Sequence, residues 1–261
     1  MTVDKSVSSA TPRACRGRAA ASPRSRAAPV AGRLPNAALD IAVCAGAYLY
    51  GSLPLVYVLA RRRQVDLKRT GSGNVGATNL MASGGPARAL AGWLFDASKG
   101  LAPILVSRRL GRSRAVAELA GVCGAAGQCW PLFLRFSGGR GISAYVGAGA
   151  AMDRGAWAGA LLPMIGGSLW RVAPHLLRLA PLPIRSKSVP LGCFISAVAL
   201  PLLVGARRGF RPRVLLAPTL LSAVVMVRRL TAPLPDDATD GPAVHRQAWL
   251  YRLLYDRNTS T

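Results

Sequence analysis

An uncharged apolar run of twenty residues, at positions 41–60, most constrains how this chain can fold. At about 1.5 Å per helical residue, such a run is long enough to cross the ~30 Å hydrocarbon layer of a bilayer. Further uncharged runs lie at residues 155–170, 188–206 and 214–227, and hydrophobic residues make up 51% of the chain. Several such runs exclude a soluble domain, so we predict an all-α, polytopic integral membrane helix bundle.

The runs predict six or seven transmembrane helices. These lie near residues 37–60, 87–107, 115–136, 141–153, 155–171, 189–206 and 212–228. Asp153 and Arg154 either form a tight turn between two short helices or lie within one long helix, so the count stays open. Small residues at 121–127 predict a close approach of helices. The predicted organisation is a disordered tail rich in Arg, Ala and Pro (1–36), a transmembrane domain (37–230) and a cytoplasmic C-terminal tail (231–261).

The net charge is +24, with 34 basic residues. The arginines are scattered through every loop without interleaved aromatic residues, so we expect no nucleic-acid partner. An Arg-rich codon bias together with anchoring to anionic membrane lipid explains the charge better. The charged loops lie on both predicted sides of the bilayer, so charge does not set the orientation. The five cysteines show no metal-ligand spacing, and we expect neither a metal nor a disulfide.

The segment GSGNVGATN, residues 71–79, follows the first apolar run and the cations Lys68 and Arg69. Bare backbone N–H groups, small hydroxyls and amides beside positive charge are the chemistry of a phosphate site. An ordinary flexible loop would not require so many donors. The predicted phosphate ligands in this segment, besides Lys68, Arg69 and Ser72, are Gly71, Gly73, Asn74, Thr78 and Asn79.

Two further polar clusters interrupt the apolar background. Asp96 and Lys99 are three residues apart on one predicted helix face, where Lys99 either forms a structural ion pair or points into a polar cavity. The turn SGGRG places Gly138, Gly139, Arg140 and Gly141 between two apolar runs and predicts a second anion site. Two such sites indicate two phosphate-bearing substrates.

A fourth cluster, Arg228 and Arg229, closes the last apolar run, and we interpret it as an interfacial anchor. The two histidines, His175 and His245, lie outside the glycine-rich clusters, so no Ser–His–Asp arrangement can be proposed. A transfer reaction here must rely on positioning, electrostatic stabilisation and the substrate's own phosphate as proton acceptor.

In this order, the clusters resemble the bacterial acyl-phosphate:glycerol-3-phosphate acyltransferases, over about residues 45–230. The resemblance rests on three stretches, AYLYGSLPLVYVLARRRQVDLKRTGSGNVGATN, FDASKGLAPILV and GQCWPLFLRFSGGRG. It implies seven helices in the plasma membrane and an active site at the cytoplasmic face. It also implies transfer of an acyl group from acyl phosphate to the 1-hydroxyl of glycerol 3-phosphate, giving lysophosphatidic acid, with no cofactor.

By matching position, the resemblance makes Ser72 the essential serine and places Lys68 where the family has Arg. It makes Gly138, Gly139 and Gly141 the glycines that bind glycerol 3-phosphate.

The sequence also departs from the family pattern. Gln128 replaces a His, Ser137 and Arg140 replace two Lys, and Ala144 stands where Thr is common. The His, Asn and Glu of the family's last motif have no counterpart in VRRLTAPLP. A catalytically degenerate relative that binds lipid precursors or pathway partners is therefore the alternative. A transporter of phosphorylated solutes ranks last, because no internal repeat is visible.

Overall fold

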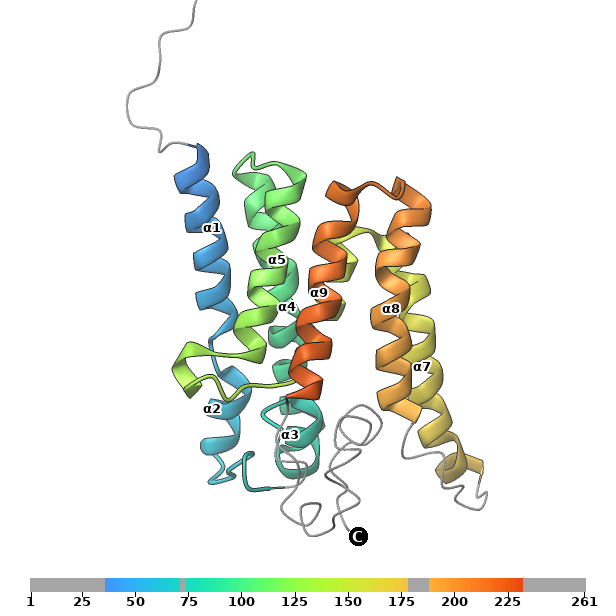
Figure 1. Ribbon diagram of the computed structural model, residues 1–261. Helices are drawn as coiled ribbons and strands as arrows, with labels where there is room; N and C mark the ends of the chain where they lie inside the picture. The colour runs from blue at the N-terminus through green and yellow to red at the C-terminus, as the bar shows by residue number, and fades with distance from the viewer. Residues whose placement is uncertain (1–35, 71–73, 178–187, 232–261) are drawn as a thin grey trace, which may run out of the picture. The chain divides into compact units, whose positions relative to one another are not determined.

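The computed structural model describes residues 36–70, 74–177 and 188–231, and every regular element in these ranges is helical. This confirms the all-α prediction for the described part of the chain. Outside these ranges lie all but residue 36 of the predicted N-terminal tail and all but residue 231 of the predicted C-terminal tail. The helices (Figure 1) are α1 Asn36–Gly51, α2 Leu55–Arg61, α3 Ala77–Gly84, α4 Pro86–Arg109, α5 Arg114–Cys129, the 3-10 turn η1 Leu132–Leu134, α6 Ile142–Met152, α7 Arg154–Leu177, α8 Ser188–Arg208 and α9 Pro212–Leu230.

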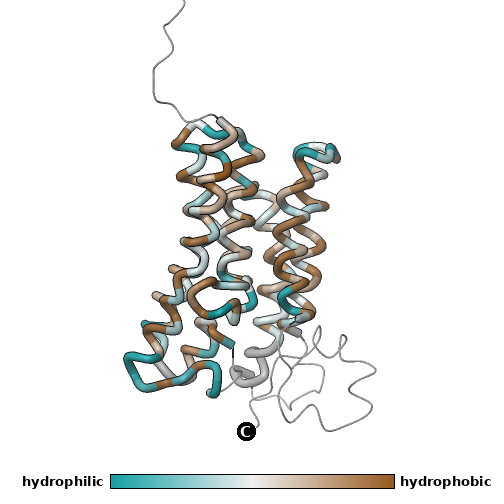
Figure 2. Tube along the Cα trace, turned by 60° about the vertical axis from the view of Figure 1, so that its left-hand side comes forward, coloured by the Kyte–Doolittle hydropathy of each residue, from teal (hydrophilic) through white to brown (hydrophobic). Residues whose placement is uncertain are grey.

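Several helices present apolar side chains to the outside of the bundle. Figure 2 shows apolar residues along the helices and polar residues mainly in the connecting segments. Among the described residues, Ala37–Arg61, Pro86–Arg109 and Val189–Arg208 are long and apolar enough to cross a membrane. Outward-facing leucines suit a hydrocarbon surrounding rather than water. Examples are Leu49, Leu94, Leu162, Leu202 and Leu216.

The first apolar run is broken, where the sequence predicts one continuous helix over 37–60. Helix α1 ends at Gly51, and α2 begins at Leu55. Pro54 has no N–H to continue the helical ladder. The Ser52 hydroxyl donates to the Tyr48 carbonyl at 2.9 Å, next to the break. The break brings the start of α2 to the candidate site described below.

Other predicted boundaries also shift. The predicted helix 115–136 ends at Cys129, before the turn at Pro131. The open question at Asp153 is settled in favour of two helices, α6 and α7. The Asp153 carboxylate accepts the Ala156 amide at 3.0 Å, as a residue that caps a helix N-terminus does. Helix α3 lies partly in a segment that the sequence predicts as a loop. The helix is short and has glycines at both ends, so its sequence looks like that of a loop.

Small residues bring the central helices together, as residues 121–127 predict. Helix α5 packs against both α1 and α4. A Cβ added to Gly124 would overlap the backbone of Lys99, and one added to Gly127 would overlap that of Tyr48. Bilayer helices associate through such close contacts, since lipid supplies no hydrophobic drive between helices. The contacts place the middle of α4 beside the end of α5, so that Asp96 and Lys99 share one pocket with Gln128.

Candidate active site

A buried ion pair forms one wall of this pocket. In α4, Lys99 Nζ lies 2.7 Å from Asp96 Oδ1, and both side chains are buried. The i, i+3 spacing brings the two groups to one helix face, as the sequence predicts. An ammonium has three N–H donors, so Lys99 can keep Asp96 and still donate to a second anion.

Gln128 connects the ion pair to α6. Its Oε1 accepts the Ala144 amide at 3.2 Å, and its side chain also hydrogen-bonds to Asp96. Because an ionised carboxylate only accepts, the amide nitrogen of Gln128 is the donor to Asp96. The Gln128 amide therefore binds the Asp96 carboxylate. Gln128 stands at the position where the family that the sequence resembles has a His.

The glycine turn SGGRG, in the segment between α5 and α6, forms another wall of the pocket. Arg135 and Phe136 adopt left-handed φ angles of 52° and 60°, which reverse the chain after η1. Gly138 packs so closely on Gln128 and Pro131 that a Cβ would overlap the carbonyl of the first and the ring of the second. The Gly139 amide donates to the Gln128 carbonyl at 3.2 Å. The turn is thereby held against the end of α5.

Arg228 holds the same turn from α9. Its Nη2 donates to the Gly138 carbonyl at 2.7 Å and its Nε to the Gly139 carbonyl at 3.1 Å. Arg229 is buried, with 4% of its surface exposed. The prediction of an interfacial anchor for these two arginines is therefore wrong. The carbonyls of an irregular turn need donors that no helix ladder supplies, and Arg228 supplies them.

Lys68 and Arg69, which precede the first glycine segment, are held in place by one buried leucine. Leu67 is fully buried and packs with Val56 and Ala60 of α2 and with Leu80 of α3. This contact holds the following residue, Lys68, at the surface, with its ammonium 5.8 Å from the Tyr57 ring centroid. Tyr57 lines the pocket, so Lys68 lies beside it.

Asn79 holds the two ends of the first glycine segment together. It is buried in α3, and its Nδ2 lies within hydrogen-bond distance of the carbonyls of Leu67 (3.0 Å), Thr70 (2.9 Å) and Asn74 (3.1 Å). The predicted donation from Asn79 to a substrate phosphate competes with these bonds. In this structure the amide nitrogen is used to brace the segment.

The two glycine segments meet at Gly139. A Cβ on Gly139 would lie 3.3 Å from the Val75 carbonyl and 3.9 Å from Asn74 Oδ1. One pocket is therefore lined by both segments, by the ion pair and by the start of α2. Its lining residues are Leu53, Pro54, Val56, Tyr57, Val75, Asp96, Lys99, Gln128, Pro131, Leu134, Gly138 and Gly139. The free volume is about 20 Å³, room for about one water, so a phosphate requires lining groups to shift.

Three predicted site residues line this pocket: Lys99, Gly138 and Gly139. Lys68 and Arg69 are exposed at the surface and do not line it. Asn74 lies next to the pocket at Gly139.

The remaining predicted site residues are placed differently. Gly71, Ser72 and Gly73 lie outside the described residues, and Thr78 belongs to α3. Arg140 and Gly141, the last two residues of the turn SGGRG, do not line the pocket. Gly141 is the N-cap residue before α6 and has a φ of 77°. A Cβ there would lie 2.5 Å from Cys129 Sγ, so this position requires glycine.

The sequence did not single out Tyr57, Gln128 or Arg228 as members of the site. Gln128 carries a signal, because it stands inside the third stretch of the resemblance. Arg228 carries none, since its bonds to Gly138 and Gly139 join residues 90 and 89 positions apart.

The helical architecture and the outward apolar faces define a membrane protein. The chain belongs to the glycerol-3-phosphate acyltransferase family, whose family model matches residues 41–232. It is 38% identical to glycerol-3-phosphate acyltransferase 5 of Dehalococcoides mccartyi over 62% of this chain and 64% of that relative. It is 33% identical to glycerol-3-phosphate acyltransferase of Geobacter sulfurreducens over 72% of this chain and 88% of that relative.

A solved structure agrees with this assignment. The chain superposes on PlsY (YgiH), described as an integral membrane glycerol 3-phosphate acyltransferase, in its glycerol 3-phosphate form, with a TM-score of 0.61. The two sequences are 26% identical, and the match covers 73% of this chain and 88% of that one. The match to this solved structure agrees with the helical architecture described above.

Proposed function

We propose that this protein transfers an acyl group from acyl phosphate to the 1-hydroxyl of glycerol 3-phosphate, giving lysophosphatidic acid and phosphate. The observation that carries the proposal is the shared pocket, where Lys99 and the Gly138–Gly139 peptide groups lie together. The names of its relatives and the ligand of the PlsY structure support glycerol 3-phosphate as the acceptor.

The reaction forms one ester bond and breaks one mixed-anhydride bond. The C1 hydroxyl oxygen attacks the acyl carbon, the bond from that carbon to the phosphate oxygen breaks, and the leaving phosphate takes the hydroxyl proton. Positive charge placed beforehand stabilises the negative charge that develops on the leaving group. Lys99 would supply this charge from inside the pocket, while Lys68, Arg69 and Arg140 would draw the anionic substrates towards it.

Backbone and hydroxyl donors would complete the site. Ser72 and the amides of Gly71 and Gly73 would orient the acyl phosphate, with Asn74 and Thr78 beside them. Gly138 and Gly139 would let the second phosphate approach the main chain closely, because they carry no side chain. Neither the binding of the two substrates nor the acyl transfer requires a cofactor.

We further propose that six or seven helices span the plasma membrane, with this pocket at the cytoplasmic face. The three long apolar segments, Ala37–Arg61, Pro86–Arg109 and Val189–Arg208, support a membrane location. An acyl phosphate has a lipid tail and a water-soluble head, so a site at a membrane boundary suits both halves.

The test is an assay of purified protein in lipid vesicles with acyl phosphate and labelled glycerol 3-phosphate. We expect labelled lysophosphatidic acid from the wild type and at least about 100-fold less from Ser72→Ala or Gly139→Leu, as loss of a transition-state contact predicts. Equal product from all three proteins would remove this site assignment. No product from any, with the fold intact, would contradict the proposed activity and favour the degenerate relative.

A further inference from the structure

A second pocket lies at the opposite end of α5 from the glycine turn. It lies between α4, α5, α6 and α7, and has a volume of about 840 Å³. Arg114, which lines this pocket, is the first residue of α5. The glycine turn packs instead against Gln128, near the last residue of α5. The sixteen residues of α5 separate the two places by about 24 Å. The pocket therefore belongs to the other membrane face and has no part in the proposed acyl transfer.

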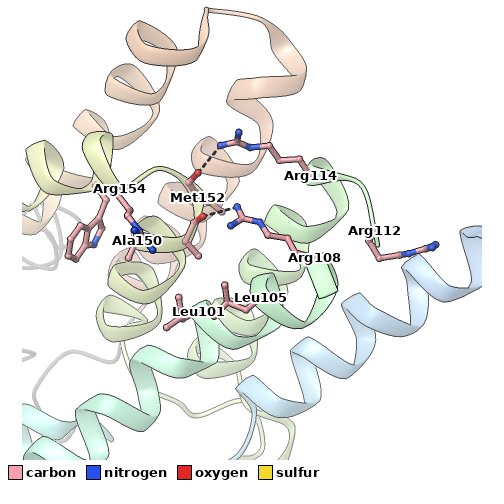
Figure 3. Close-up of a pocket in the computed structure, with 10 residues that line it drawn as sticks. Leu101, Leu105, Arg108, Arg112, Arg114, Ala150, Met152 and Arg154 are labelled. Carbon is pink, nitrogen blue, oxygen red and sulfur yellow. Dashed lines mark hydrogen bonds between the residues drawn. The ribbon is translucent and has the colours of Figure 1, made fainter. Parts of the chain in front are cut away.

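Arginines gather at the mouth of this pocket. Figure 3 shows Arg108 and Arg114 directed towards the end of α6, with Arg154 close to Ala150. Arg108 Nη2 donates to the Ala151 carbonyl at 2.7 Å, and Arg114 Nη2 donates to the Met152 carbonyl at 2.9 Å. These carbonyls end α6 and hold the guanidinium groups in place. The partial negative charge of a helix C-terminus, about half an elementary charge, offsets only part of the charge of the two arginines.

Carboxylates near the pocket are fewer than the cations. Arg114 and Arg208 share one buried carboxylate, Glu118, each at 2.9 Å. Within the described part of the chain, no carboxylate pairs with Arg108 or Arg154. The pocket mouth is therefore positively charged and suited to an anion.

The wall below the arginines is apolar. Leu101, Leu105 and Arg108 follow one another on α4 at helical spacing, so they share one face of that helix. Leu105 is 41% exposed, and Trp157 of α7 completes the wall. In a bilayer, this order places cations at the headgroup level and leucines at the level of the acyl chains.

We propose that this pocket binds one anionic membrane phospholipid. Its phosphate would lie between Arg108, Arg114 and Arg154, and an acyl chain would run along Leu105 and Leu101. A free anion would use the arginines alone and gain nothing from the leucine wall. The combination of charge and apolar surface on one helix face selects a lipid instead. Such a lipid would join α4, α6 and α7 at the membrane face away from the acyl-transfer site.

Thermal unfolding of the full chain in mild detergent tests the proposal. Each sample receives phosphatidylglycerol, phosphatidylcholine or inorganic phosphate. We expect phosphatidylglycerol to raise the midpoint of the wild type by about 5 °C, as binding to the folded state alone predicts, and the other two additions to have little effect. An equal rise with phosphatidylcholine or with inorganic phosphate would overturn the proposal.

Matched variants distinguish lipid binding in this pocket from a general effect of the protein's positive charge. Arg108→Gln with Arg154→Gln should abolish the response to phosphatidylglycerol. Arg109→Gln with Arg213→Gln removes the same charge from exposed residues that do not line the pocket and should retain the response. A retained response in the first pair, or a lost response in the second, would contradict the proposal.

One single variant covers the case in which the first pair does not fold. Arg154 is exposed at the start of α7, so Arg154→Glu should leave the fold intact. It should raise the phosphatidylglycerol concentration needed for half of the shift at least about tenfold, since a like charge then faces the phosphate. An unchanged concentration would overturn the proposal even without the double variant.

Discussion

Lys99 has two partners in the proposed reaction, the Asp96 carboxylate and a substrate phosphate. The first is present in the structure at 2.7 Å. The second would be bound by the ammonium donors that Asp96 does not use. If Lys99 only forms a structural ion pair, neutralising Asp96 and Lys99 together should preserve the reaction rate. If Lys99 also binds the substrate phosphate, the rate should fall.

Lys99→Gln should lower kcat/KM at least about 100-fold, because it removes the positive charge that stabilises the negative charge on the leaving phosphate. It should also destabilise the fold by about 3–5 kcal/mol, since Asp96 is left buried without its cation. Asp96→Asn together with Lys99→Gln should restore most of the stability but not the rate. Rates and thermal midpoints of the single and double variants check this. A double variant with the wild-type rate would show that Lys99 only neutralises Asp96.

At the scale of helices and turns, the site depends on contacts between elements far apart in the chain. The glycine turn between α5 and α6 is held by an arginine of α9. The far end of α5 is tied to α8 through Glu118 and Arg208. Helices α6 and α7 are joined at Asp153, which also binds Arg207 of α8 at 2.9 Å.

Arg228→Gln should disturb the glycine turn without removing any group that we assign to substrate. We expect a KM for glycerol 3-phosphate raised about tenfold, because two carbonyls lose their charged donor and the turn becomes less ordered. Arg228→Lys should recover only part of the effect, since an ammonium cannot reproduce the forked geometry. Steady-state kinetics check this, and an unchanged KM in Arg228→Gln would contradict it.

Glu118→Gln should destabilise the bundle by about 1.5–3 kcal/mol, because two arginines lose their charged hydrogen bonds to one buried carboxylate. Asp40→Asn is the matched control. Asp40 is one-third exposed and pairs with Arg112 at a longer 3.4 Å, so its loss should change stability by only about 0–1 kcal/mol. Thermal or denaturant unfolding of the two variants tests this, and equal losses would contradict the difference in burial.

Asp153 should make stability depend on pH. Burial acts to raise the pKa of Asp153, but hydrogen bonds from the Ala156 amide and the Arg207 guanidinium outweigh it and lower the pKa below the ordinary 3.8. The resulting stabilisation is present above pH 3.8 and is lost as the pH falls through the lowered pKa. The midpoint of wild-type unfolding should therefore fall more steeply than that of Asp153→Asn below about pH 4. Parallel curves for the two proteins would contradict this.

The sequence predicts the helices better than their breaks and contacts. Uncharged length is a local property, so the apolar runs at 41–60 and 188–206 were visible in the sequence. The interruption before α2 was not, because membrane helices often tolerate a residue such as Pro54. Arg228 could not be assigned to the site, since an arginine at a helix end looks the same whether it meets lipid or a distant turn.

Across the whole described bundle, the close packing of α4, α5 and α6 brings chemistry from separate motifs into one pocket. Val75, Lys99 and Gly138 come from three separate stretches of the sequence, and the glycines along α5 allow them to meet. Of the proposed site, the sequence identified Lys99 and the glycine turn by their polarity among apolar residues. It could not show that Asn79 braces its segment, because this depends on three carbonyls brought together only by folding.

Saturation binding of labelled glycerol 3-phosphate to the protein in lipid tests the central claim most directly. Three proteins are compared: the wild type, Gly138→Ala and Gly46→Ala. Gly138 has no room for a Cβ, whereas a Cβ on Gly46 meets nothing within 4 Å. We expect Gly46→Ala to bind like the wild type and Gly138→Ala to bind at least about tenfold more weakly, as displacement of a phosphate-binding turn predicts. Equal affinity in all three proteins would contradict a phosphate site at this turn.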